Sequence, residues 1–123
     1  MKSALRLAVL SLLMCLPAHA YEIETGAMMI CDTQKQVERY VQLFDGNQQV
    51  AIRAVNAEEK DPNACALVDV AYVQGPELAM ARSRSHTFKI IPIAVFAVNT
   101  PGGYRPAKLA HFFTLVEVRE FGV

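Results

Sequence analysis

The chain has 123 residues, 12 lysines and arginines against 12 aspartates and glutamates, and 53% hydrophobic residues. This length fits one compact domain and excludes repeat arrays and multidomain enzymes, while the apolar content and low net charge exclude intrinsic disorder. A nucleic-acid-binding module would need a basic surface, which this charge balance disfavours.

Residues 1–20 have the three parts of a secretory signal peptide. Lys2 and Arg6 give a positive start, 7–16 form an apolar run, and 18–20 read Ala-His-Ala, a small-x-small cleavage site. A membrane-spanning helix needs about 20 apolar residues, so this run is too short to remain as an anchor. We therefore expect cleavage after Ala20.

Cleavage there leaves a domain of 103 of the 123 residues, spanning 21–123, with ten basic and twelve acidic side chains. The competing interpretation is a lipoprotein leader with Cys15 as the acylated residue. Met14 stands before that cysteine, where such processing favours a small side chain. The expected location is the periplasm, with secretion beyond the cell as the alternative.

Loss of the leader leaves two cysteines, Cys31 and Cys65. Two thiols in an exported chain favour a disulfide, because the receiving compartment is oxidising. The alternatives are a redox pair or half of a metal site. A redox pair usually has the close spacing C-x-x-C, and a metal site would need further ligands. The cysteine count thus predicts a structural disulfide.

The first half of the mature chain predicts a strand over 21–30 and then helices. Asp32 and Thr33 can cap a helix, and the apolar stripe that follows has the 3.6-residue period, up to a stop at 45–46. Residues 47–56 fit either a strand or a helix. We favour a helix that ends with Asn56 in the left-handed conformation. Residues 57–63 are charged and contain Asp-Pro, which is typical of a loop.

The second half predicts strands over 64–73, 77–85, 86–98 and 109–118. Pro92 lies within the third of these and demands a sheet edge, a bulge or a bend. Residues 99–103 (Asn-Thr-Pro-Gly-Gly) are the strongest turn signal. The order predicts an α+β domain: a short N-terminal strand, one or two helices, then a mainly antiparallel, curled sheet of about four strands.

One candidate binding surface is the run Arg82-Ser83-Arg84-Ser85-His86. On a strand, Arg82, Arg84 and His86 would share a face, because side chains two apart point the same way. Such a ladder could bind a carboxylate, phosphate or sulfated sugar. The alternative is a solvated strand whose charges guard against aggregation.

A second candidate is the turn carrying Tyr104 and Arg105, since tyrosine and arginine supply many interface hot spots. The alternative, which loop statistics favour, is a plain hairpin connection whose tyrosine folds back on the sheet.

Residues of the types used in catalysis are present but are not spaced for it. His86, His111, Cys31, Cys65 and Asp69 include the types found in cysteine hydrolases and zinc sites. No His-x-x-x-His or Gly-x-Ser-x-Gly spacing occurs, and a disulfide would remove the nucleophile. His111 is expected to be part-buried. We therefore predict no catalytic residue, metal ligand or cofactor.

Several short motifs are shared with a known group. They are the leader, Ile30-Cys31-Asp32-Thr33 with Gln36-Val37-Glu38-Arg39, Ala54-Val55-Asn56, Ala64-Cys65-Ala66-Leu67-Val68 and Phe112-Phe113-Thr114. The chain resembles a group of small exported proteins of alphaproteobacteria, particularly of rhizobium-type bacteria. The resemblance implies a Gram-negative periplasm and a paired-cysteine domain, and it brings no activity or ligand with it.

The sequence thus favours a non-enzymatic periplasmic domain that binds an envelope protein or a small anionic molecule and no nucleic acid. The alternative is a thiol-based or hydrolytic periplasmic enzyme.

Overall fold

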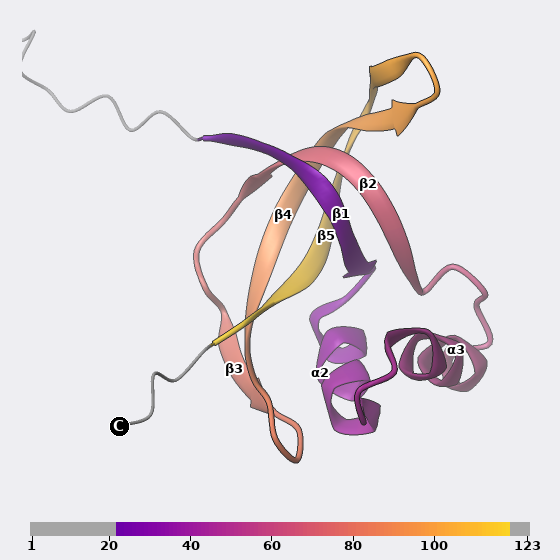
Figure 1. The fold of residues 1–123 in the computed structure, drawn as a ribbon, viewed down its shortest axis with the longest axis vertical. Coiled ribbons are helices and arrows are strands. Elements are labelled where there is room, and N and C mark those ends of the chain that lie inside the picture. The colour runs from indigo at the N-terminus through magenta and orange to yellow at the C-terminus, as the bar shows by residue number, and fades with distance from the viewer. Residues whose placement is uncertain (1–21, 119–123) are drawn as a thin grey trace, which may run out of the picture.

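The computed structural model describes residues 22–118 and has the α+β architecture that the sequence predicts (Figure 1). One strand is followed by two helices and then by four strands, all in a single antiparallel sheet. The elements are β1 (Ile23–Cys31), α2 (Gln34–Leu43), α3 (Gln48–Glu59), β2 (Cys65–Gln74), β3 (Ala79–Arg82), β4 (Thr87–Thr100) and β5 (Gly103–Glu117).

Helix α2 begins at the predicted cap. The Thr33 hydroxyl accepts a hydrogen bond from the Gln36 backbone N–H (3.2 Å), and the Gln36 side-chain oxygen accepts from the Thr33 N–H (3.1 Å). This reciprocal pair is a capping box, which satisfies two amides that the first turn leaves free. The predicted apolar stripe is buried, with Val37, Tyr40 and Val41 at most 2% exposed.

Helix α3 resolves the ambiguity of residues 47–56. The Asn47 side chain accepts from the Val50 N–H (3.1 Å), which starts a helix there. The expected end at Asn56 is wrong, because the helix runs to Glu59 and Lys60 takes the left-handed conformation (φ 54°).

Asn56 instead holds the start of β2. Its side-chain amide donates to the Cys65 carbonyl (3.0 Å) and accepts from the Cys65 N–H (2.8 Å), and it also donates to the Pro62 carbonyl (2.9 Å). An asparagine amide carries the same donor and acceptor as a peptide group. The Asn56 amide therefore pairs with the backbone of Cys65 as a neighbouring strand would, on the side of Cys65 that faces away from β1.

Replacing Asn56 with alanine is expected to lower the free energy of unfolding by about 2 kcal/mol, because the buried Cys65 N–H and C=O lose their partners. Urea denaturation measures the change. Asn63→Ala is the matched control: Asn63 is exposed, and its replacement should change stability by about 0.5 kcal/mol at most. Equal effects of the two changes would contradict this role for Asn56.

The sheet is curled, as predicted. β1 pairs with β2 from Ile23↔Val73 to Cys31↔Cys65, and β5 pairs with β4 along most of its length. β2 also pairs with the second half of β4, and β1 meets β5 at Cys31↔Phe113. The four strands β1, β2, β4 and β5 therefore form a ring that is narrowly joined between β1 and β5.

Two strands differ in length from the prediction. β5 begins at Gly103 rather than at residue 109, because the two-residue turn over 101–102 leads directly into pairing with β4. β3 covers only Ala79–Arg82 of the predicted 77–85, because the chain turns after Arg82.

Pro92 lies where β4 changes its neighbour, so of the three settings expected for this proline the structure shows a local strand edge. β4 pairs with β2 up to Gln74↔Ile93 and with β3 from Ala79↔Ile90. The Pro92 carbonyl accepts from the Gly75 N–H (2.8 Å). In a strand the N and O of one residue point to the same side. The nitrogen of Pro92 therefore faces the gap between β2 and β3. Its lack of an N–H costs the sheet no hydrogen bond there, because β4 pairs with neither strand at this residue.

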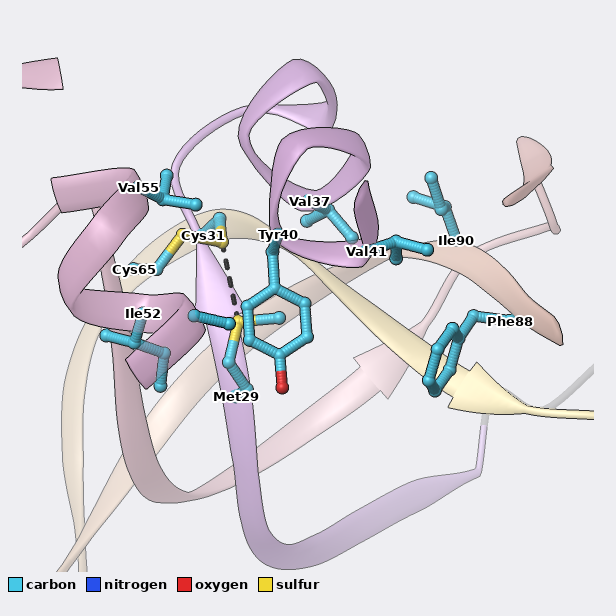
Figure 2. Close-up of a cluster of buried hydrophobic side chains, with 11 residues drawn as sticks. Met29, Cys31, Val37, Tyr40, Val41, Ile52, Val55, Cys65, Phe88 and Ile90 are labelled. Carbon is cyan, nitrogen blue, oxygen red and sulfur yellow. Dashed lines mark hydrogen bonds between the residues drawn. A yellow bond between two sulfur atoms is a disulfide. The ribbon is translucent and has the colours of Figure 1, made fainter. Parts of the chain in front are cut away.

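Two apolar cores lie on opposite faces of the sheet. The helix-side core packs α2 and α3 against β1, β2 and β4 (Figure 2), and its members are Met29, Cys31, Val37, Tyr40, Val41, Ala51, Ile52, Val55, Cys65, Phe88 and Ile90. The second core contains Ile30, Val70, Ile91, Ile93 and Val95. The neighbours Ile90 and Ile91 point to different cores, which explains why this part of the sequence is apolar on both faces.

Candidate binding surfaces on the sheet

The predicted disulfide is present and buried. Cys31 and Cys65 are directly opposite each other on β1 and β2, their sulfur atoms are bonded, and each residue is 1% exposed. Figure 2 shows the bond among the side chains of the helix-side core, with the Met29 sulfur 3.4 Å from the Cys31 sulfur. Thiolate chemistry needs an accessible sulfur, so this position favours a structural role.

The expected ladder of Arg82, Arg84 and His86 is wrong. β3 ends at Arg82, and residues 83–86 form a tight turn closed by a hydrogen bond from the Ser83 N–H to the His86 carbonyl (2.9 Å). The alternation rule for strands does not apply across a turn, so the three side chains do not share a strand face. The Arg82 Nε donates to Thr87 Oγ1 (3.3 Å) and is thus tied to the turn.

His86 is held inward rather than presented to a ligand. Its Nδ1 lies 2.7 Å from Glu117 Oε1. The imidazole ring also contacts the rings of Phe44 and Phe88, with centroids 5.4 and 5.9 Å away. These contacts fasten the β3–β4 turn to the ends of α2 and β5, which is a packing role.

Tyr104 folds back onto the sheet, as the plain hairpin alternative predicts. Its hydroxyl donates to Asp69 Oδ1 (2.7 Å), and Asn99 Nδ2 donates to the other carboxylate oxygen (2.9 Å). The Tyr104 and Asn99 hydrogen bonds lower the pKa of Asp69, and the same bond raises the pKa of Tyr104. Asp69, one of the residues of catalytic type, is thereby engaged in joining β2 to the β4–β5 hairpin.

Changing Tyr104 to phenylalanine is expected to raise the pKa of Asp69 towards its ordinary value, because the largest stabilisation of the carboxylate is lost. Asn99→Ala should raise it by a smaller amount. Since the folded-state pKa is lowered, the stability that this carboxylate contributes is present above its unfolded pKa and is lost as pH falls through the folded value. NMR titration of Asp69 measures both shifts, and an unchanged pKa in Tyr104→Phe would refute this assignment.

The structure does not bring the two predicted groups of surface residues together. The turn after Arg82 and the turn before Tyr104 lie at opposite ends of β4 (Figure 1). β4 has 14 residues, which corresponds to about 45 Å along the strand. Arg82, Arg84 and His86 therefore belong to a different surface from Tyr104 and Arg105.

The remaining residues of catalytic type are scattered. His111 is exposed, not part-buried as expected, and it borders a shallow depression of about 270 Å³ beside Gly75 and Pro92. The other lining residues are mostly apolar. Within residues 22–118, no three His, Cys, Asp or Glu side chains form a group that could hold a metal ion.

The most open surface is the first half of β5, of which the sequence analysis identified Tyr104 and Arg105 but not the residues that follow them. Seven consecutive residues, Gly103 to Leu109, are exposed, and in the described structure this stretch pairs only with β4. Residues 107–109 form a bulge opposite Phe96, and Leu109 is 59% exposed. Pro106 is the sequence signal that could have revealed this edge, because proline within a sheet is confined to edges and bulges.

Two cations on this stretch have no partner among the described residues. Arg105 and Lys108 make no ion pair or hydrogen bond within 22–118. Arg105 lies opposite Val98 and Tyr104 opposite Asn99, so Arg105 and Tyr104 point to opposite faces. The Asp69 carboxylate, which binds Tyr104, is therefore on the face away from Arg105. We call residues 103–112 the open edge.

Comparisons with known proteins returned no matching family model, no matching curated protein and no matching solved structure. The helices of the described part of the chain include none that is long and apolar enough to cross a membrane.

Proposed function

We propose that this protein is an exported, non-enzymatic binding domain of the Gram-negative periplasm, and that it binds a polypeptide partner along the open edge. The observation that carries the proposal is the run of seven exposed strand residues, Gly103 to Leu109, beside an unpaired backbone edge. Addition of a strand to such an edge is a common mode of peptide recognition.

The periplasmic location is supported by the leader-like residues 1–20 and by the Cys31–Cys65 bond. Residues 1–20 lie outside the described residues, so the leader stays a prediction from sequence. A buried disulfide fits an oxidising compartment. Secretion beyond the cell remains the alternative, and cell fractionation separates the two.

A binding role is favoured over the thiol-based alternative by the placement of the two sulfur atoms. Each cysteine is 1% exposed and is covered by side chains of α2 and α3, such as Val37 and Val55. A substrate would have to displace this core to reach the bond. The open edge needs no such rearrangement.

Photocrosslinking in living cells tests the proposal. A photoreactive amino acid at position 109 is expected to give one discrete adduct whose partner peptide is identified by mass spectrometry. The same amino acid at position 59, exposed on α3, is the control. If position 109 gives no more adduct than position 59, the open edge is not a binding surface.

A further inference from the structure

We propose that the partner of the open edge is an extended, acidic polypeptide segment, which pairs with β5 through its backbone and with Arg105 and Lys108 through carboxylates. This inference rests on the proposed function and adds the chemistry of the partner. It depends on three features of β5: its unpaired backbone, its charge and its arrangement of apolar side chains.

The backbone of the open edge points to a polypeptide. Apart from the bulge over 107–109, residues 103–112 pair with β4 on one side, and the backbone pairing of β1 with β5 in the described structure is at Phe113 alone. Unpaired N–H and C=O groups along a strand recruit another strand. The unpaired edge is irregular, because Pro106 lacks an N–H and residues 107–109 form a bulge. A partner that pairs with β5 on both sides of this bulge must follow its course. A flexible, extended segment can do so, whereas a strand of a rigid sheet cannot.

The charge of the open edge selects an acidic segment. From Gly103 to Val116 the sequence contains Arg105, Lys108 and His111 and no aspartate or glutamate. Neither Arg105 nor Lys108 is neutralised by another residue within 22–118. Opposite charges in facing positions stabilise a strand pair, whereas like charges destabilise it.

The positive charge of the open edge also argues against its pairing with the open edge of a second copy of the chain. Two open edges that pair antiparallel about a two-fold axis near Lys108 would bring Lys108 of each copy together and place Arg105 near His111. Lys108 of each copy would then face the like charge of the other copy, so edge pairing between copies is disfavoured. Lysine and proline protect natural edge strands from such self-pairing.

Exposed apolar groups beside the cations complete the surface. Val98 is 42% exposed and lies opposite Arg105, and Leu109 is 59% exposed in the bulge next to Lys108. A segment in which acidic and apolar residues alternate would place its two kinds of side chain on opposite faces. Its acidic side chains would share one face with Arg105 and Val98, and its apolar side chains would share the other face with Tyr104, which is 43% exposed.

The test measures binding of a blocked, fluorescent octapeptide of alternating glutamate and valine to the exported, purified protein by fluorescence anisotropy. Two control peptides accompany it: one with lysine in place of glutamate, and one with alternate amides N-methylated. We expect the acidic peptide to bind at least tenfold more tightly than either control, because the first control reverses the charge and the second removes backbone donors.

A charge-reversed variant of the protein tests whether Arg105 and Lys108 bind the carboxylates of the peptide. Arg105→Glu with Lys108→Glu is expected to weaken binding of the acidic peptide about tenfold and to strengthen binding of the lysine peptide. The matched control is Lys35→Glu with Arg53→Glu, the same charge change at exposed positions on α2 and α3, and it should leave both affinities unchanged. Circular dichroism confirms that each variant is folded.

Three outcomes would overturn the inference. Equal binding of the N-methylated peptide would mean that charge alone acts and no strand is added. Absence of binding by the acidic peptide at millimolar concentration would exclude the acidic segment. Binding to phosphatidylglycerol vesicles that depends on Arg105 and Lys108, without peptide binding, would identify a lipid surface instead.

These failures are distinct from failure of the proposed function. An adduct at position 109 with a partner segment that lacks acidic residues would refute the acidic chemistry but retain the binding domain. No adduct at position 109 would refute both.

Discussion

Replacing both Cys31 and Cys65 with alanine is expected to lower the free energy of unfolding by about 4 kcal/mol and the melting temperature by about 20 °C. The bond closes a loop with a sequence separation of 34 residues, and the unfolded chain regains the freedom of that loop when the bond is absent. Since small domains have total stabilities of about 5–10 kcal/mol, the variant would be close to unfolding at 37 °C.

Chemical denaturation of the wild type with and without reductant provides the control. The reduced wild type should lose nearly as much stability as the double variant, because both lack the bond and differ only in two buried sulfur atoms. If reduction left the unfolding midpoint unchanged, the sulfur atoms would serve some purpose other than holding β1 to β2.

Ile90→Ala is expected to cost about 3–4 kcal/mol in the free energy of unfolding. Ile90 is 0% exposed and packs in the helix-side core between β4 and the helices. Truncation removes the buried methyl and methylene groups and leaves a cavity that the ring of strands and the two helices cannot easily fill.

Ile23→Ala is the matched control for Ile90→Ala, because it is the same substitution at a residue that is 66% exposed. Its effect should be about 0.5 kcal/mol or less. Urea unfolding of both variants gives the comparison, and similar losses at the two positions would show that the helix-side core does not lie where the structure places it.

Local signals predicted most of the fold. The cap at Thr33, the stripe through Val37 and Tyr40, and the turn over 99–103 are encoded within a few residues, and each is confirmed. The end of α3 was mispredicted because Asn56 has two possible roles. It can adopt a left-handed conformation or use its amide for a distant partner, and only the folded chain brings Cys65 beside it.

The candidate surfaces were harder to predict because they depend on which strand edges remain unpaired. The alternation of Arg82, Arg84 and His86 fits a strand equally well, but the turn at 83–86 breaks it. The open edge is marked in the sequence only through Tyr104 and Arg105 at its start and through Pro106. Its exposure results from the narrow junction of β1 and β5 at Cys31↔Phe113, a contact between residues 82 positions apart.

That junction between the first and last strands has a consequence for biogenesis. The hydroxyl of Thr114 donates to the Met29 carbonyl (2.7 Å), so the ring closes only when the late part of the polypeptide has become available. A nascent chain that stops short of Phe113 cannot complete its tertiary structure. Folding of this domain is therefore a late event in its synthesis, which suits the proposed export of the chain in an unfolded form.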